Sequence, residues 1–181
     1  MPRIPAIDPA TATGAAADQL ALTRKMFGAT PNMFTTAAQS PAALTAMNAF
    51  FAALGKGQLG GKVGEQVAIA VAQTNGCEYC LAAHTAIGGM HGVSAADLGD
   101  AKRGAASDAR AQAALTLALA IVRTKGRVTD AELAAARVAG LVEGEIVEVV
   151  AHVALNVFTN YFNNLAGTDV DFPRVALETA A

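Results

Sequence analysis

The chain has 181 residues, a net charge of −2, and 53 % apolar against 15 % charged residues. This length predicts one compact domain, and the apolar excess excludes a disordered chain, which has the reverse balance. Thirteen Lys and Arg residues against 15 Asp and Glu residues exclude the basic surface of a nucleic-acid binder and a polybasic membrane anchor. The 44 alanines and the absence of Trp predict an all-α fold, because alanine has the highest helix propensity.

Turn and capping residues divide the chain into nine predicted helices. We expect them over residues 15–27, 31–38, 41–54, 62–73, 77–87, 94–102, 108–124, 130–139 and 143–166. Gly88 and Gly89 are expected to end the fifth helix. Thr129 and Glu132 have the spacing of a capping box and predict the start of the eighth helix.

The domain organisation follows from the same pattern. Residues 1–40 are expected to form an N-terminal extension whose helices pack on the core, and residues 41–181 to form the main domain. The first 14 residues lack the apolar core of a signal peptide, and the longest apolar stretch, residues 113–122, is too short for a membrane span. We therefore expect a cytoplasmic protein with no nucleic-acid partner and no membrane contact.

A short internal similarity accompanies two of the predicted helices. The segments Lys56–Leu59 and Lys125–Val128 both begin with Lys-Gly, and each precedes a helix. His84 and His152 follow these segments at similar distances along the chain. A duplicated helical unit and chance both explain the similarity.

The run from Cys77 to His84 carries the most informative residues. On a helix, Cys77, Cys80 and His84 occupy positions i, i+3 and i+7 and share one face. Cys80 and His84 are one turn apart, so their thiol and imidazole can make contact. The i, i+3 spacing also allows the two cysteines to form a disulfide. These residues predict redox chemistry in a reducing compartment.

Glu65 adds a carboxylate to this group. The helices on either side of Asn75-Gly76 are joined by a very short turn, so they are expected to form an antiparallel hairpin. Reflection across the turn places Glu65 beside His84 rather than beside Cys77. The helix around Glu65 is apolar on every side, so a carboxylate there needs a buried partner. The order Glu65, His84, Cys80 predicts a chain of groups that takes a proton from a thiol or delivers one to a leaving group.

Other interpretations of these residues remain open. A C-x-x-C pair is half of a zinc site, with His84 as a third ligand, but His91 and His152 lie beyond a glycine break or on another helix. The two cysteines can also be small buried side chains without a role. A glutamate such as Glu65 is commonly a solvated carboxylate that favours a helix start. We expect neither a bound metal nor an organic cofactor.

The pattern of Glu65, Cys77-x-x-Cys80 and His84 resembles the signature of the alkylhydroperoxidase D-like (AhpD-like) proteins of the carboxymuconolactone decarboxylase superfamily. The resemblance extends from about Pro41 through the last predicted helix. It implies a single-domain, AhpD-like helical fold over residues 41–181 that assembles into homo-oligomers, either trimers or hexamers.

The resemblance also implies a function, that of an antioxidant thiol-dependent peroxidase. The cysteine pair reduces hydroperoxides or passes electrons to a partner peroxiredoxin, and a lipoylated protein or a small dithiol is the reductant. Peroxide oxidises Cys80, Cys77 then forms a disulfide with it, and Glu65 and His84 relay protons. Tyr79 departs from the family pattern, because better characterised peroxidases have a histidine there and tyrosine is no base near neutral pH.

Two physical arguments disagree about which cysteine attacks peroxide. Unpaired N–H groups at the helix start favour a thiolate at Cys77, whereas the one-turn spacing to His84 activates Cys80. A positioned base acts directly on the moving proton, so we expect Cys80 to attack. Cys77, nearer the turn, is expected to be the more exposed and to exchange with the external dithiol.

Competing functional hypotheses are a redox-sensing or structural oligomer whose cysteine pair cycles without turnover, and a carboxymuconolactone decarboxylase-like enzyme. The decarboxylase branch generally lacks the cysteine pair.

A polar stripe follows the last helix at a spacing of three to four residues. It consists of His152, Asn156, Asn160 and Asn163 or Asn164. Hydrogen bonds between helices or subunits, a role beside the active site and a solvated face are the three interpretations.

Overall fold

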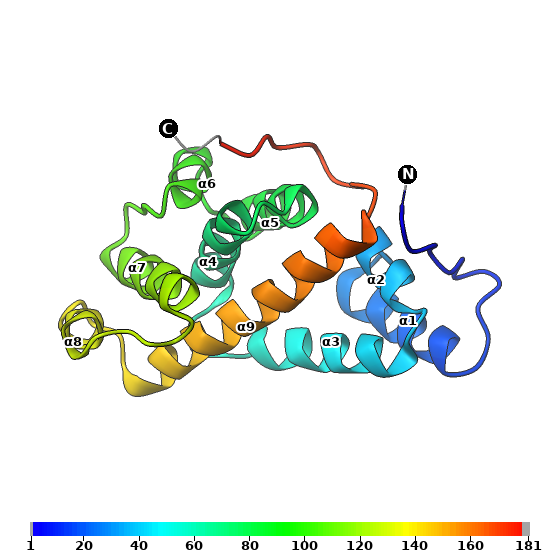
Figure 1. The fold of residues 1–181 in the computed structure, drawn as a ribbon, viewed down its shortest axis with the longest axis horizontal. Helices are drawn as coiled ribbons and strands as arrows, with labels where there is room; N and C mark the ends of the chain where they lie inside the picture. The colour runs from blue at the N-terminus through cyan, green and yellow to red at the C-terminus, as the bar shows by residue number, and fades with distance from the viewer. Residues whose placement is uncertain (1, 179–181) are drawn as a thin grey trace.

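A computed structural model describes residues 2–178, and this part of the chain contains nine α-helices and no β-strand (Figure 1). In chain order they are α1 (Gly14–Phe27), α2 (Asn32–Ala37), α3 (Pro41–Leu54), α4 (Gly61–Thr74), α5 (Glu78–Met90), α6 (Ala95–Lys102), α7 (Ala109–Thr124), α8 (Asp130–Val138) and α9 (Glu143–Ala166). The all-α prediction is confirmed, and each predicted helix is present with ends within three residues of those expected.

The predicted end of α5 is wrong. The helix continues through Gly88 and Gly89 to Met90. A Cβ atom on Gly88 would lie 2.8 Å from a methyl group of Leu98. Gly88 therefore allows α6 to pack closely against α5, and this contact stabilises a helical turn that glycine alone disfavours. The capping box of Thr129 and Glu132 is present as expected at the start of α8.

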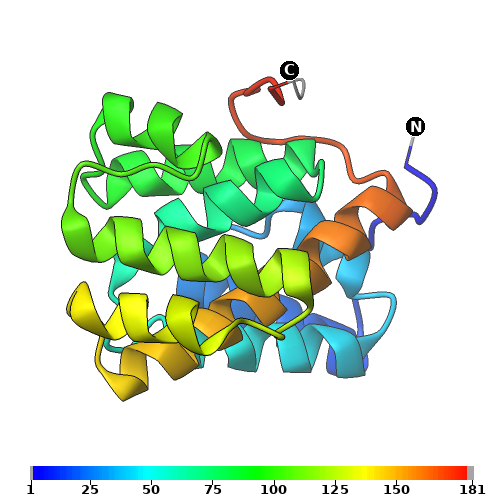
Figure 2. The same cartoon turned by 60° about the vertical axis from the view of Figure 1, so that its left-hand side comes forward.

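Helix α4 lies at the centre of the fold and packs against α5, α6, α7 and α9. Figure 1 shows α5 alongside α4, α7 to its left and α9 running diagonally across the molecule, and the turned view in Figure 2 brings α7 to the front. Side chains on every face of α4 are buried, including Val67, Ile69 and Val71. This burial follows from an apolar sequence without a polar face. A residue on α4 is therefore held in a fixed position by packing on all sides.

The N-terminal region joins the same core rather than forming a separate one. Helices α1 and α2 pack on α3, and Leu20, Met33 and Phe34 are buried in the one hydrophobic core. The chain before α1 runs beside the end of α9, where the N–H of Arg3 donates to the carbonyl of Ala166. The fold is a single domain.

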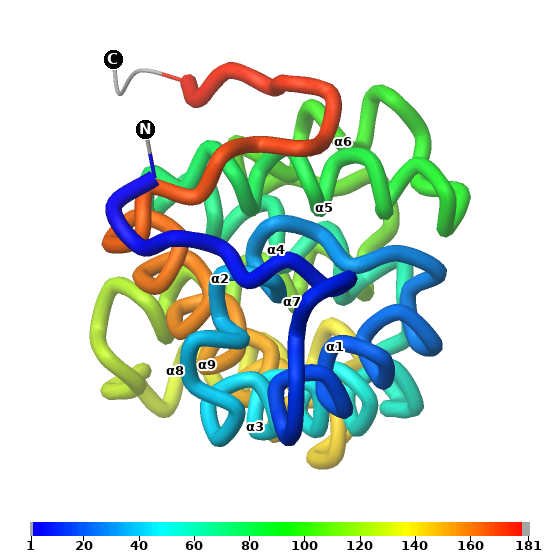
Figure 3. Tube along the Cα trace, turned by 90° about the vertical axis from the view of Figure 1, so that its right-hand side faces the viewer, coloured from blue at the N-terminus to red at the C-terminus, as the bar shows by residue number. Residues whose placement is uncertain are grey.

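The tail after α9 crosses the start of α5, on the same side of the molecule as the N-terminal segment (Figure 3). Phe172 packs edge-to-face against Tyr79 of α5, with ring centroids 5.8 Å apart. The carboxylate of Asp171 accepts a hydrogen bond of 2.8 Å from the backbone N–H of Asn32, the first residue of α2. These contacts fix the tail over the first turn of α5.

The two Lys-Gly segments have different conformations, although their sequences are similar. Lys125 and Gly126 both have positive φ values, of 55° and 83°. Gly57 has no positive φ, and it lies against the carboxylate of Glu148, which leaves no room for a Cβ atom. The sequence similarity therefore does not extend to the backbone.

No helix within residues 2–178 is both long enough and apolar enough to cross a membrane.

Candidate active site

Helices α4 and α5 form the predicted antiparallel hairpin. Gly76, with a φ of 63°, makes the left-handed turn that L side chains disfavour. The N–H of Cys77 donates to the carbonyl of Ala72 at 2.9 Å, and this bond closes the turn. The hairpin thus places the end of α4 beside the start of α5, and residues near the start of α4 beside the later turns of α5.

Glu65 and His84 are hydrogen-bonded across this hairpin. The distance from Glu65 Oε2 to His84 Nδ1 is 2.8 Å, and both side chains are largely buried. Burial lowers the pKa of His84, but the charge of Glu65 and its hydrogen bond outweigh it and raise the pKa above the usual value. The predicted proximity of these two residues is confirmed. The imidazole is therefore positively charged over a wider pH range than a free histidine.

Both cysteines are reduced and buried, with exposed fractions of 0 % for Cys77 and 2 % for Cys80. The expectation that Cys77 is the more exposed is wrong. The end of α9 covers the turn, because Asn75 donates to Asn160 at 3.0 Å and accepts from Asn164 at 3.1 Å. The local sequence around the cysteines contains no signal for contacts with asparagines that lie 85 and 89 residues after Asn75.

Cys77 is the N-cap of α5 rather than its first residue. Its Sγ accepts a hydrogen bond of 3.2 Å from the N–H of Cys80. The hydrogen bond between the two side chains, together with burial, raises the pKa of Cys77. The helix start thus does not produce a thiolate at Cys77.

The environment of Cys80 has the opposite effect. Burial opposes ionisation, but the hydrogen bond from Cys77, the positive charge of His84 and the amide of Asn163 together lower the pKa of Cys80 to about 7. A cysteine with this pKa is about half ionised at neutral pH. The structure therefore favours the thiolate at Cys80, in agreement with the argument from His84.

The polar stripe of α9 has several separate roles. Asn156 donates to the carbonyl of His152 within the helix, while Asn160 and Asn164 bond to the α4–α5 turn. Asn163 donates from Nδ2 to Sγ of Cys80 at 3.2 Å. Its contact with a reactive sulfur was missed as a definite prediction, because the pattern alone does not show which neighbour each asparagine meets.

His152 lies near the site but does not replace any member of it. Its ring packs against Gly64, where a Cβ atom would lie 2.9 Å from Cε1. Burial lowers the pKa of His152, and the charges of Glu148 and Glu65 only partly oppose this. The absence of a side chain at Gly64 thus allows the ring to approach the backbone of α4 directly before Glu65.

Tyr79 has a structural explanation at the position that departs from the family pattern. Its hydroxyl oxygen accepts a hydrogen bond of 3.2 Å from the N–H of Met33. Burial and the nearby carboxylate of Asp171 raise the pKa of Tyr79, against the lowering effect of the Met33 bond. Tyr79 therefore connects α5 to α2 and to the tail. Because its pKa is raised, the hydroxyl stays protonated near neutral pH and cannot act as a general base.

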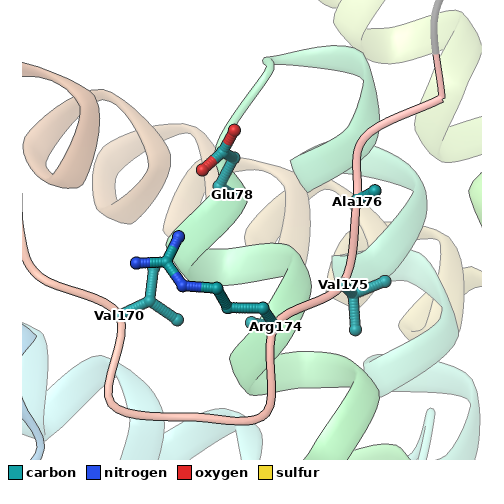
Figure 4. A pocket seen from close by; sticks show the side chains of 6 residues that line it. Glu78, Val170, Arg174, Val175 and Ala176 are labelled. Carbon is teal, nitrogen blue, oxygen red and sulfur yellow. The ribbon is translucent and has the colours of Figure 1, made fainter.

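Two cavities lie between the start of α5 and the tail. The larger, of about 340 Å³, has Glu78 of α5 and Arg174 of the tail in its wall. In Figure 4 the Arg174 side chain extends from the tail toward Val170, and the Glu78 carboxylate lies above it. The smaller, of about 250 Å³, is lined by Gly76, Glu78, Tyr79, Asn163, Asn164, Gly167, Thr168, Val170 and Leu177. Asn163 connects this smaller cavity to Cys80.

The described residues contain no group of three His, Cys, Asp or Glu side chains arranged to hold a metal ion. The cluster of Glu65, His84, Cys80 and Cys77 combines a carboxylate, an imidazole with a raised pKa and two cysteine sulfurs instead. Together the fold and this cluster define an all-α protein with a cysteine-based candidate active site.

Comparison with known proteins agrees with that class. The sequence model of the carboxymuconolactone decarboxylase family matches residues 41–124, the segment that contains α4 and α5. The match covers less than half of the chain and shows that this segment is similar to that family, while the fold of the whole chain is that of the AhpD-like proteins. No curated protein matches the sequence.

Several solved structures share the fold. A peroxidase-related protein from Ralstonia eutropha JMP134, described as an alkylhydroperoxidase AhpD core, is 24 % identical over 94 % of this chain and 92 % of its own, with a TM-score of 0.82. A peroxidase-related protein from Silicibacter sp. TM1040 is 23 % identical over 91 % and 90 %, with a TM-score of 0.74. The debrominase Bmp8 is 18 % identical over 86 % of both chains, with a TM-score of 0.73. These similarities concern the fold.

Proposed function

We propose that the chain is a thiol-dependent peroxidase that uses Cys80 as nucleophile, Cys77 as resolving cysteine, and Glu65 and His84 as a proton relay. The observation that carries the proposal is the 2.8 Å bond between Glu65 and His84 beside a cysteine whose pKa is lowered to about 7. A thiolate at neutral pH with a charged imidazole nearby is the arrangement that peroxide reduction needs.

The first step forms a sulfur–oxygen bond. The thiolate of Cys80 attacks the terminal oxygen of a hydroperoxide, the O–O bond breaks, and the leaving alkoxide takes a proton from the imidazolium of His84. Glu65 holds the imidazole through Nδ1, which leaves Nε2 as the proton donor. The products are a sulfenic acid on Cys80 and an alcohol, or water when the substrate is hydrogen peroxide.

The second step closes a disulfide. The thiol of Cys77 attacks the sulfenic sulfur of Cys80, and water leaves. Their positions at the N-cap and third residue of α5, with Sγ of Cys77 already bonded to the N–H of Cys80, support this pairing. An external dithiol, such as a lipoylated protein, then reduces the disulfide, and a peroxiredoxin disulfide is an alternative oxidant for the pair.

The test is hydroperoxide consumption with dihydrolipoamide as reductant, using cumene and tert-butyl hydroperoxide. We expect turnover in the wild-type protein and none in Cys80→Ser. Cys77→Ser should form a sulfenic acid on Cys80 that dimedone traps, but no disulfide. Sulfenic acid found on Cys77 alone would reverse the roles, and no consumption by the wild type would refute a peroxidase.

A second candidate function is reductive debromination of a small aromatic compound. It is favoured by the debrominase Bmp8, which shares the fold and has a Cys→Ala variant solved in complex with 2,3,4-tribromopyrrole. In such a reaction two thiols become a disulfide while a C–Br bond becomes C–H and hydrogen bromide is released. Bromide release from tribromopyrrole, without hydroperoxide consumption, would favour this candidate over the peroxidase.

A further inference from the structure

Asn163 of α9 both lines a cavity and makes a hydrogen bond to the sulfur of Cys80. It lines the cavity of about 250 Å³ at the start of α5, here called the thiol-side cavity. Its Nδ2 donates to Sγ of Cys80 at 3.2 Å. A molecule in this cavity that contacts Asn163 is thereby brought next to Cys80.

The other end of the same amide has no partner. Oδ1 of Asn163 is fully buried and finds no hydrogen-bond partner among residues 2–178, although the side chain is only 3 % exposed. Oγ1 of Thr168, which also lines the thiol-side cavity, is unpartnered within the same part of the chain. Native proteins rarely bury polar atoms without a partner, so these two atoms point to a polar ligand.

The chemistry of the amide identifies the ligand. Sγ of a thiolate only accepts hydrogen bonds, so Nδ2 of Asn163 faces it and Oδ1 is the free acceptor. An acceptor selects a ligand with an O–H or N–H group. The remaining walls include Val170 and Leu177, which suit a small apolar substituent.

We propose that Asn163 is a catalytic residue that binds the hydroperoxide, accepting the O–H of its terminal oxygen at Oδ1 while donating to the Cys80 thiolate at Nδ2. This inference rests on the proposed peroxidase function. One planar amide then sets both reactants side by side: the oxygen to be attacked and the attacking sulfur. The bond changes are those of the first step above, and the terminal oxygen passes to sulfur as the sulfenic acid while His84 protonates the alkoxide.

The experiment compares two reagents on the Cys80 thiol in a Cys77→Ser background. One is tert-butyl hydroperoxide, followed by dimedone trapping, and the other is iodoacetamide, which needs no acceptor at Oδ1. Both rates are measured at neutral pH, where the mechanism above has an imidazolium to protonate the alkoxide, and each rate is divided by the thiolate fraction of its variant. In Asn163→Ala we expect this normalised rate of sulfenic acid formation to fall about 10²-fold, by analogy with removal of an oxyanion-binding donor, and the normalised rate of alkylation to stay near the wild-type value.

A second readout is the pH at which alkylation is half-maximal. Loss of a hydrogen bond to a charged sulfur should raise it by about one unit in Asn163→Ala. The isosteric Asn163→Asp, which adds a carboxylate beside the thiolate, should raise it further and serves if the alanine variant does not fold. Asn156→Ala is the matched control, because Asn156 is an equally buried asparagine of α9 that bonds to the carbonyl of His152 and does not line the thiol-side cavity.

Three results decide the inference. Selective loss of the hydroperoxide reaction in Asn163→Ala, with Asn156→Ala unchanged, supports it. Equal slowing of both reagents, or of neither, overturns it and leaves the peroxidase function standing. Absence of sulfenic acid in the Cys77→Ser protein itself refutes the peroxidase function, and the hydroperoxide as ligand with it.

Discussion

The α4–α5 hairpin and the α8–α9 unit each follow a Lys-Gly segment and each carry one partly or fully buried histidine, but the two histidines have opposite properties. His84 bonds to Glu65 at 2.8 Å and its pKa is raised. His152 packs against Gly64 instead and its pKa is lowered. The comparison teaches that a direct carboxylate contact, rather than burial or sequence context, decides whether the pKa of a buried imidazole is raised.

The two units also differ in the surface they present. The hairpin faces inward, with most of α4 and residues Tyr79, Cys80 and Leu81 of α5 buried. Helix α9 instead has an exposed apolar stripe, which consists of Val147, Val150, Phe158, Tyr161 and Leu165. These residues follow each other at helical spacing, so the stripe lies along one face. We therefore propose that the hairpin and the buried face of α9 carry the chemistry, and we expect the exposed apolar stripe of α9 to mediate assembly.

The largest expected effect comes from removing the contact that distinguishes the two histidines. In Glu65→Gln and in His84→Gln, hydroperoxide turnover should fall by about 10²–10⁴, because the alkoxide loses its proton donor. Stopped-flow consumption of cumene hydroperoxide measures this, with circular dichroism to verify the fold. Turnover at the wild-type rate in both variants would reduce the pair to a structural hydrogen bond.

The next effect concerns the α9 stripe and the expected trimer or hexamer. Tyr161 is 60 % exposed in the single chain. Tyr161→Asp should raise the dissociation constant of the assembly about 30-fold, the loss expected for one aromatic hot spot. Analytical ultracentrifugation measures it, with Val138→Asp on α8 as the control. A monomeric wild-type protein at micromolar concentration would contradict the assignment.

A smaller effect is expected in the pH dependence of thiol alkylation. In the wild type, the alkylation rate of Cys80 should rise with pH and reach half its maximum at about 7. Glu65→Gln removes the charge that raises the pKa of His84, so the imidazolium is lost at lower pH and the pKa of Cys80 rises. A one-unit rise slows alkylation at pH 7 about fivefold. An unshifted profile would show that Glu65 does not act through His84 on the sulfur.

The smallest effect is expected for the other histidine. The pKa of His152 is lowered, so its imidazole is neutral at pH 7 and its removal changes no charge near Cys80. His152→Gln should leave hydroperoxide turnover within about threefold of the wild type. A loss as large as that of His84→Gln would place His152 in the proton relay and remove the contrast between the units.

Much of the fold was predictable because the relevant signals are local. Alanine content, caps and glycine stops give all nine helices, and the short turn at Gly76 places Glu65 beside His84. The burial of Cys77 was not predictable, since it depends on Asn160 and Asn164 of α9. The continuation of α5 past Gly88 depends likewise on Leu98. The predictions therefore fail where a residue far away in the sequence determines the local structure. The contact between Asn163 and Cys80 was missed for the same reason.

The sulfur of Cys77 caps α5 in the reduced protein, since it accepts the N–H of Cys80. A disulfide with Cys80 would replace this hydrogen bond by a covalent link, and loss of an N-cap typically costs a helix about 1 kcal/mol. The amide hydrogen of Cys80 should therefore exchange with deuterium faster in the oxidised than in the reduced protein. Tyr79, between the two cysteines, packs against Phe172, so looser order in this turn would reach the tail. Oxidation would then be readable at the surface of the molecule, as faster deuterium uptake in a segment that contains no cysteine.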